Sequence, residues 1–191
     1  MAEAMTWVAL LRGVNVGKAH RVPMEVLRAL LSDMGCTQVK TLLNSGNAVF
    51  VAPGPASAAR ALALAAGLSR ALHARLGLDV PVVVKSARSW AAIVEGNALA
   101  SAPGVAPPDP SRLMVAVAQD AAQLQALKTI EALVSPPEAF HVGADAAYLH
   151  CAGGILESKA AKALLGRAGQ AVTTRNWATT LKIHALCASA A

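Results

Sequence analysis

Apolar residues follow two patterns along the chain: short runs that are almost continuous, and longer segments in which large apolar residues recur every three or four positions. Residues 6–11 form an almost wholly apolar run, which is typical of a strand covered on both faces. Residues 23–34 show the helical spacing, and Gly35 is a suitable helix stop. The first half is thus predicted to contain strands at 6–11, 37–42, 48–52 and 80–85 and helices at 23–34, 57–76 and 87–94.

Residues 96–110 are rich in proline and glycine and show no periodicity, which is typical of a linker. Beyond them the order of strands and helices returns. Strands are predicted at 113–118, 139–142, 147–151 and 170–173, and helices from Asp120, at 158–165 and at 177–187. The predicted fold class is α+β, with two tandem ferredoxin-like βαββαβ modules, antiparallel sheets and a C-terminal helix. The expected boundaries are 1–95 for the first module, 96–111 for the Pro/Gly-rich linker and 112–191 for the second module with the C-terminal helix.

The βαββαβ order predicts which polar loops meet. In such a unit the first and second strands run parallel with the third between them, so the turn at 12–21 and the hairpin at 44–47 should share one end of the first sheet. Residues 157–159 and 173–177 should likewise share one end of the second sheet. We expect two polar clusters, which we call the first and the second cluster, and we expect them to face a common cleft.

The turn of the first cluster has the chemistry of an anion site. Gly13 and Gly17 let backbone amides approach an anion closely, while Arg12 offers a planar fork and Lys18 a mobile charge. The alternative is that the glycines only satisfy turn geometry and that Asn15 only bonds its own loop. The turn is not a Walker A loop, since the glycines are one residue too close and neither Ser nor Thr follows the lysine.

The other polar segments have equally ordinary alternatives. The hairpin can be a simple turn, and Thr174 or Asn176 can simply cap the last helix, with Trp177 buried. If that helix start is open, Arg175 and free amides would favour an anion there. The candidate ligand-binding residues are Arg12, Gly13, Asn15, Gly17, Lys18, Ser45, Asn47, Ser158, Lys159, Thr174, Arg175 and Asn176.

Three stretches give the chain a resemblance to a known family. They are LRGVNVG at 11–17, SGNAVF at 45–50 and TTRNW at 173–177, with Ser158-Lys159 ahead of the third. They resemble the signature segments of a bacterial family catalogued as domain of unknown function 1697 (DUF1697), and the resemblance extends over essentially the whole chain. It implies two ferredoxin-like modules, and it implies no activity, because the activity of that family is unsettled.

Composition narrows the function classes. Hydrophobic residues make up 55% of the chain, but alanine inflates this value, and no segment has the length and apolarity of a membrane span or a signal peptide, so a cytoplasmic protein without membrane contact is expected. The three cysteines have no zinc-type spacing and are expected to be reduced thiols. His141 and His150 could face each other across a hairpin, yet the histidines show no metal spacing and no catalytic motif is present. We therefore expect neither a metal nor a cofactor and name no catalytic residue.

The net charge of +6 permits attraction to phosphates, whereas the six aromatic residues speak against a site of several stacked bases. The leading hypothesis is a protein that binds a phosphate-bearing small molecule or nucleic acid. An enzyme acting on a phosphorylated or carboxylated metabolite and a structural or protein-interaction module are the alternatives, and the sequence leaves the oligomeric state open. Binding to phosphate should weaken with ionic strength, which separates the first two classes from the third.

Overall fold

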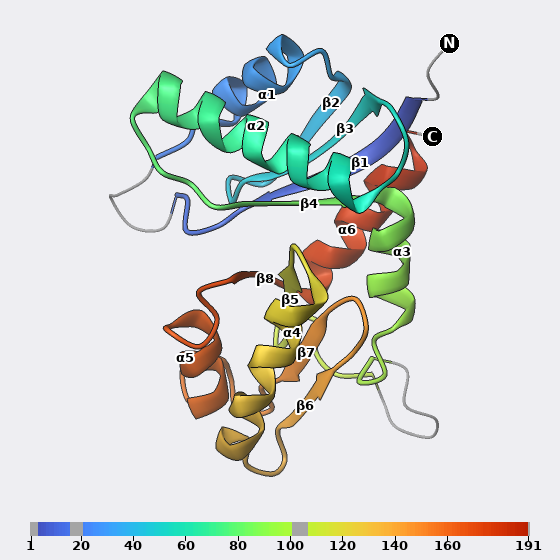
Figure 1. Cartoon of the computed structure of the whole chain (residues 1–191). Coiled ribbons are helices and arrows are strands. Elements are labelled where there is room, and N and C mark those ends of the chain that lie inside the picture. Colours follow the sequence, from blue (N-terminus) through green and yellow to red (C-terminus); the bar gives the residue numbers. More distant parts are fainter. Residues whose placement is uncertain (1–3, 16–20, 101–106, 191) are drawn as a thin grey trace. The chain divides into compact units, whose positions relative to one another are not determined.

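Two four-stranded antiparallel sheets, each with its own helices, make up the described residues 4–15, 21–100 and 107–190 of the computed structural model (Figure 1). This confirms the predicted α+β class and its antiparallel sheets. Internal contacts divide the chain into two units: unit 1 runs to Trp90 and resumes at Lys182, and unit 2 runs from Ala91 to Leu181.

In unit 1 the strand order is β2-β3-β1-β4, and every pair of neighbours is antiparallel. β4 lies at an edge of the sheet and begins directly after Pro81, as expected for a strand preceded by a residue that cannot donate a ladder hydrogen bond. The elements are β1 (Ala4–Leu11), α1 (Met24–Asp33), β2 (Thr37–Leu42), β3 (Asn47–Pro53), α2 (Ala58–Leu76), β4 (Val82–Ser86) and the first residues of α3 (Ala87–Glu95).

The core of unit 1 lies between the sheet and helices α1 and α2. Trp7 and Phe50 of the sheet pack with Leu27 of α1 and Leu68 of α2, and all four side chains are fully buried. Helix ends follow from local chemistry, as at α2, where the Ser57 hydroxyl accepts a hydrogen bond from the backbone N–H of Arg60.

In unit 2 the strand order is β6-β7-β5-β8, again antiparallel throughout. The helix expected from Asp120 is a short α-helix that continues as a 3-10 helix. Its buried residues Leu124, Leu127 and Ile130 recur every third position, the period that places side chains of a 3-10 helix on one face. The elements are β5 (Leu113–Ala118), α4 (Ala121–Gln125), the 3-10 helix (Ala126–Leu133), β6 (Ala139–Val142), β7 (Ala147–His150), α5 (Lys159–Leu165), β8 (Val172–Asn176) and α6 (Trp177–Ala188).

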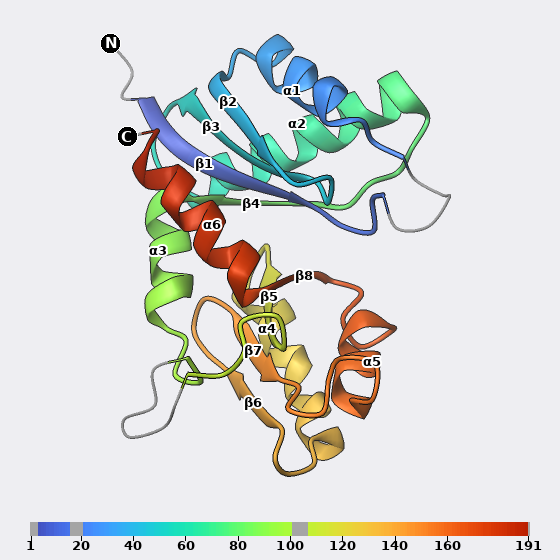
Figure 2. The same cartoon turned by 180° about the vertical axis from the view of Figure 1, so that it is seen from behind.

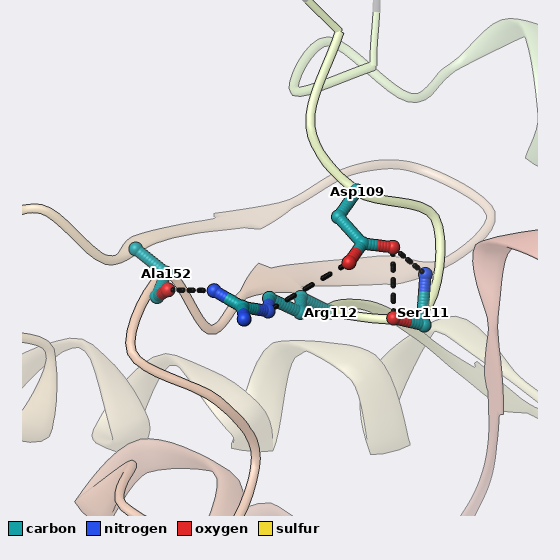
Figure 3. Close-up of polar contacts among 4 residues, drawn as sticks. All are labelled: Asp109, Ser111, Arg112 and Ala152. Atoms are coloured by element: carbon teal, nitrogen blue, oxygen red, sulfur yellow. Dashed lines mark hydrogen bonds and ion pairs between the residues drawn. The ribbon is translucent and has the colours of Figure 1, made fainter.

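Hydrogen bonds and an ion pair fix the chain where it enters β5 (Figure 3). The Asp109 carboxylate accepts hydrogen bonds from the amide and the hydroxyl of Ser111, which lower the pKa of that carboxyl. The guanidinium of Arg112 donates to the Ala152 carbonyl at 2.7 Å and lies 3.7 Å from the second Asp109 oxygen. These exposed groups direct the end of the predicted linker into the strand.

The contact-based units change over inside helices α3 and α6. The module boundaries expected at 1–95, 96–111 and 112–191 stay a prediction. The last residues of the chain belong to unit 1. Near the end of α6, the Ala190 carbonyl accepts a hydrogen bond from the Thr6 hydroxyl of β1, and the Ser189 hydroxyl accepts one from the Lys40 ammonium of β2. Helical periodicity shows that a segment has a buried face but not which sheet it covers. Throughout the described ranges, no helix combines the length and apolarity needed to cross a membrane.

Candidate functional site

The turn after β1 and the hairpin between β2 and β3 meet at one end of the sheet of unit 1, as predicted (Figures 1 and 2). The Leu11 N–H donates to the Gly46 carbonyl at 2.8 Å, and the Arg12 N–H donates to the Pro81 carbonyl at 2.9 Å. The approach at Gly46 is so close that a Cβ atom there would lie 2.6 Å from the Cβ of Leu11. This first cluster is therefore a packed junction of three chain segments.

Asn15 closes the loop of the first cluster. Its Oδ1 accepts from the Val22 N–H at 3.0 Å, and its Nδ2 donates to the Val22 carbonyl at 2.9 Å and to the Asn44 carbonyl. Both N–H groups of the carboxamide are thereby used, and the backbone of Asn15 adopts a left-handed conformation with φ of 57°. Asn15 shapes the loop and ties it to the hairpin.

The side chain of Asn47 also makes hydrogen bonds to neighbouring residues of the protein. Its side chain is only 1% exposed, and Nδ2 donates to the Leu42 carbonyl and to the Ser45 hydroxyl, both at 3.0 Å. These bonds hold the hairpin as it turns from β2 into β3. The described contacts therefore account for Asn47 and Ser45 as turn residues.

The remaining candidates of the first cluster are Arg12, which is half-buried, and Gly13, which is exposed with φ of 66°. Gly17 and Lys18 lie outside the described residues.

A surface pocket of about 420 Å³ opens beside this junction, at the start of α1. Two of its polar side chains, Arg21 and Asn44, are exposed, and neither makes a hydrogen bond or ion pair within the described parts of the chain. Pro23 precedes α1 without offering a side-chain cap, and Met24, the first residue of this helix, lines the pocket. The described lining is Asn15, Arg21, Val22, Pro23, Met24 and Asn44.

Arg21 and Asn44 were not among the candidates from sequence. Both lie at the end of a segment that the sequence predicts to be polar: Arg21 is the last residue of the turn at 12–21, and Asn44 is the first residue of the hairpin at 44–47. Arg21 stands three residues before the first helical residue, Met24, and this proximity to a helix start was the available signal.

In unit 2, β8 ends at the edge of the sheet where β5 begins, and the meeting of 157–159 with 173–177 at that edge stays a prediction. Residue pairing sets Met114 opposite Asn176, and Cys151, which follows β7, donates its N–H to the Arg112 carbonyl. The Ser158 hydroxyl accepts from the Ala161 N–H at 3.0 Å and caps α5. Lys159 is exposed.

Arg175 and Asn176 of the second cluster make hydrogen bonds within their own segment. The guanidinium donates to the Thr173 hydroxyl at 2.9 Å and to the Thr174 carbonyl at 2.7 Å, while Asn176 Oδ1 accepts from the Thr179 N–H at 2.9 Å and caps α6. Burial lowers the pKa of Arg175 to about 10, so the group stays charged at neutral pH. That the two clusters share one cleft stays a prediction.

The expectation for the histidine pair was wrong. His141 pairs with Tyr148 across the hairpin of β6 and β7, and the two rings stack with centroids 6.3 Å apart, whereas His150 pairs with Ala139. The residues of the connecting turn set this register, and the strand pattern alone does not reveal it. Among the described residues no group of three or more His, Cys, Asp or Glu side chains could hold a metal ion.

Comparison with known proteins places these features in a family. The sequence model of DUF1697, described as a protein of unknown function, matches residues 5–148, which include the whole first cluster and the pocket. A solved structure, that of the conserved bacterial protein SP0830 from Streptococcus pneumoniae, superposes with a TM-score of 0.77 at 22% identity, covering 97% of this chain and 99% of that chain. At this identity the likeness concerns the fold alone. No curated protein matches the sequence.

Proposed function

Because the chain belongs to the DUF1697 family, whose function is unknown, we propose a function from its own pocket: the protein binds a small molecule that carries a phosphate group at the start of α1. We further infer that both sheets are ferredoxin-like modules, since each follows the βαββαβ order with the third strand of the unit between its first and second.

The observation that carries the proposal is the pairing of Arg21 and Asn44 in one pocket. Both side chains are exposed donors without another partner in the described chain, and they come from segments that Asn15 holds together. A guanidinium offers a planar fork that matches phosphate oxygens, and a carboxamide adds a neutral donor. The amides at the start of α1 add a positive dipole end, partly offset by the Glu25 carboxylate in the first turn.

The carboxamides of Asn15 and Asn47 give this pocket a preorganised backbone frame. Their hydrogen bonds hold the loop and the hairpin, so the backbone next to Arg21 and Asn44 is fixed before a ligand binds. Preorganisation lowers the entropic cost of binding. The described lining offers charge and hydrogen bonds but no carboxylate, imidazole or thiol, which favours binding over catalysis.

The test is titration of the protein with a panel of phosphorylated metabolites, followed by calorimetry. We expect Arg21→Gln to weaken binding by about 10-fold to 100-fold, the effect of losing a hydrogen bond to a charged group. Arg70→Gln is the matched control, since Arg70 is an exposed arginine of unit 1 that does not line the pocket. Affinity should fall as salt rises. Equal affinity of Arg21→Gln and the unaltered protein would refute the proposal.

A further inference from the structure

The pocket at the start of α1 is much larger than a phosphate group needs. Its volume is about 420 Å³, whereas a water molecule has a share of about 30 Å³ in the liquid and a phosphate group has the size of only a few waters. Pockets of about 300–1,000 Å³ typically hold whole organic ligands. If Arg21 and Asn44 hold a phosphate group, as proposed above, most of the pocket is left for the organic part of the ligand.

Part of the remaining surface is apolar. Pro23 is exposed and Met24 is half-buried along the lining, whereas Val22 beside them is buried. Leu43, which adjoins Asn44 in the hairpin, is 54% exposed and adopts a left-handed backbone with φ of 57°. Leu43 does not line the pocket, but its exposed side chain leaves apolar surface next to the pocket residue Asn44, in a backbone conformation that costs free energy for a residue other than glycine.

We infer that the ligand is a mononucleotide, with its phosphate on Arg21 and its base against the surface of Pro23 and Met24. This inference rests on the proposed function. A thioether and a proline ring offer polarisable, apolar contacts to the face of an aromatic ring. A sugar phosphate would leave the apolar lining without a counterpart.

The experiment compares four probes by calorimetry: adenosine monophosphate, ribose 5-phosphate, adenosine and inorganic phosphate. We expect adenosine monophosphate to bind at least 10-fold more tightly than each of the other three. Equal binding of adenosine monophosphate and ribose 5-phosphate would overturn the mononucleotide inference and leave the phosphate site standing. Equal binding of adenosine and adenosine monophosphate, or no binding of any phosphate, would overturn the proposed function as well.

Variants test the apolar surface separately. Met24→Gln keeps the length of the side chain, and Met34→Gln is its matched control, because Met34 packs against the same core but follows the last residue of the same helix. Loss of a sulfur contact with an aromatic ring should weaken adenosine monophosphate about 2-fold to 10-fold and leave ribose 5-phosphate unchanged. Pro23→Ala, at an exposed position, serves if Met24→Gln does not fold. Equal losses for both probes, or for both methionine variants, would count against the inference.

Discussion

Gly46 carries the junction between the hairpin and the turn after β1, so its replacement by alanine is the most direct test of that junction. Its φ of 74° lies in the left-handed region, where a Cβ atom costs about 1–2 kcal/mol. The added Cβ would also lie 2.6 Å from the Cβ of Leu11 and 2.8 Å from Cγ2 of Val14. The shifts of side chains and backbone that such overpacking forces typically lower stability by about another 1–3 kcal/mol. We expect Gly46→Ala to lower the free energy of unfolding of unit 1 by roughly 2–5 kcal/mol.

Gly35→Ala is a matched control that separates the two contributions. Gly35 has a similar φ of 80°, but a Cβ atom there would meet nothing within 4 Å. This variant should therefore cost only the conformational contribution of about 1–2 kcal/mol.

Hydrogen exchange of the amides of unit 1 is the suitable assay, because it reports the opening of each segment. The Leu11 amide is the most informative probe, since it donates to the Gly46 carbonyl. We expect Gly46→Ala to lose protection there and Gly35→Ala to retain most of it. If the two variants lose equal stability, the close approach of the hairpin contributes nothing and the reasoning fails.

Three further predictions concern buried titratable groups. The hydroxyl of Tyr148, the only tyrosine of the chain, donates to the Ile93 carbonyl at 2.7 Å, and Tyr148→Phe should cost about 1–3 kcal/mol by leaving that carbonyl unpaired, as measured by urea unfolding. Burial raises the pKa of Tyr148. The stability that the neutral phenol confers is therefore present below the pKa of the unfolded state, about 10, and is lost as pH rises through the pKa of the folded state. Tyrosinate absorbance should appear only with unfolding, and reversible ionisation at lower pH would contradict this. Burial likewise raises the pKa of Cys187 to about 11, and it raises the pKa values of Cys36 and Cys151. Ellman's reagent at neutral pH should therefore label the folded protein slowly and label all three thiols after unfolding. Rapid labelling of the folded protein would show an accessible thiolate and contradict this.

The positions of most elements follow from the sequence alone. The apolar run at 113–118 and the predicted helix at 57–76 reappear as β5 and α2, because strand and helix periodicities are local properties of the side-chain order. Even the meeting of the described residues after β1, up to Asn15, with the hairpin at 44–47 follows from the βαββαβ order, because that order decides which strand ends lie at the same edge.

Only the tertiary structure decides which of the polar groups at that edge are open to a ligand. Asn15 and Asn44 have the same side chain and both lie in predicted turns, yet the first spends its N–H groups on its own loop and on the hairpin while the second faces the pocket unpaired within the described chain. A sequence lists donors and acceptors, but their pairing depends on distances between segments that folding alone brings together. For the same reason, periodicity predicts the last helix, but only the hydrogen bonds of Ser189 and Ala190, which follow that helix, to β1 and β2 show that the end of the chain belongs with unit 1.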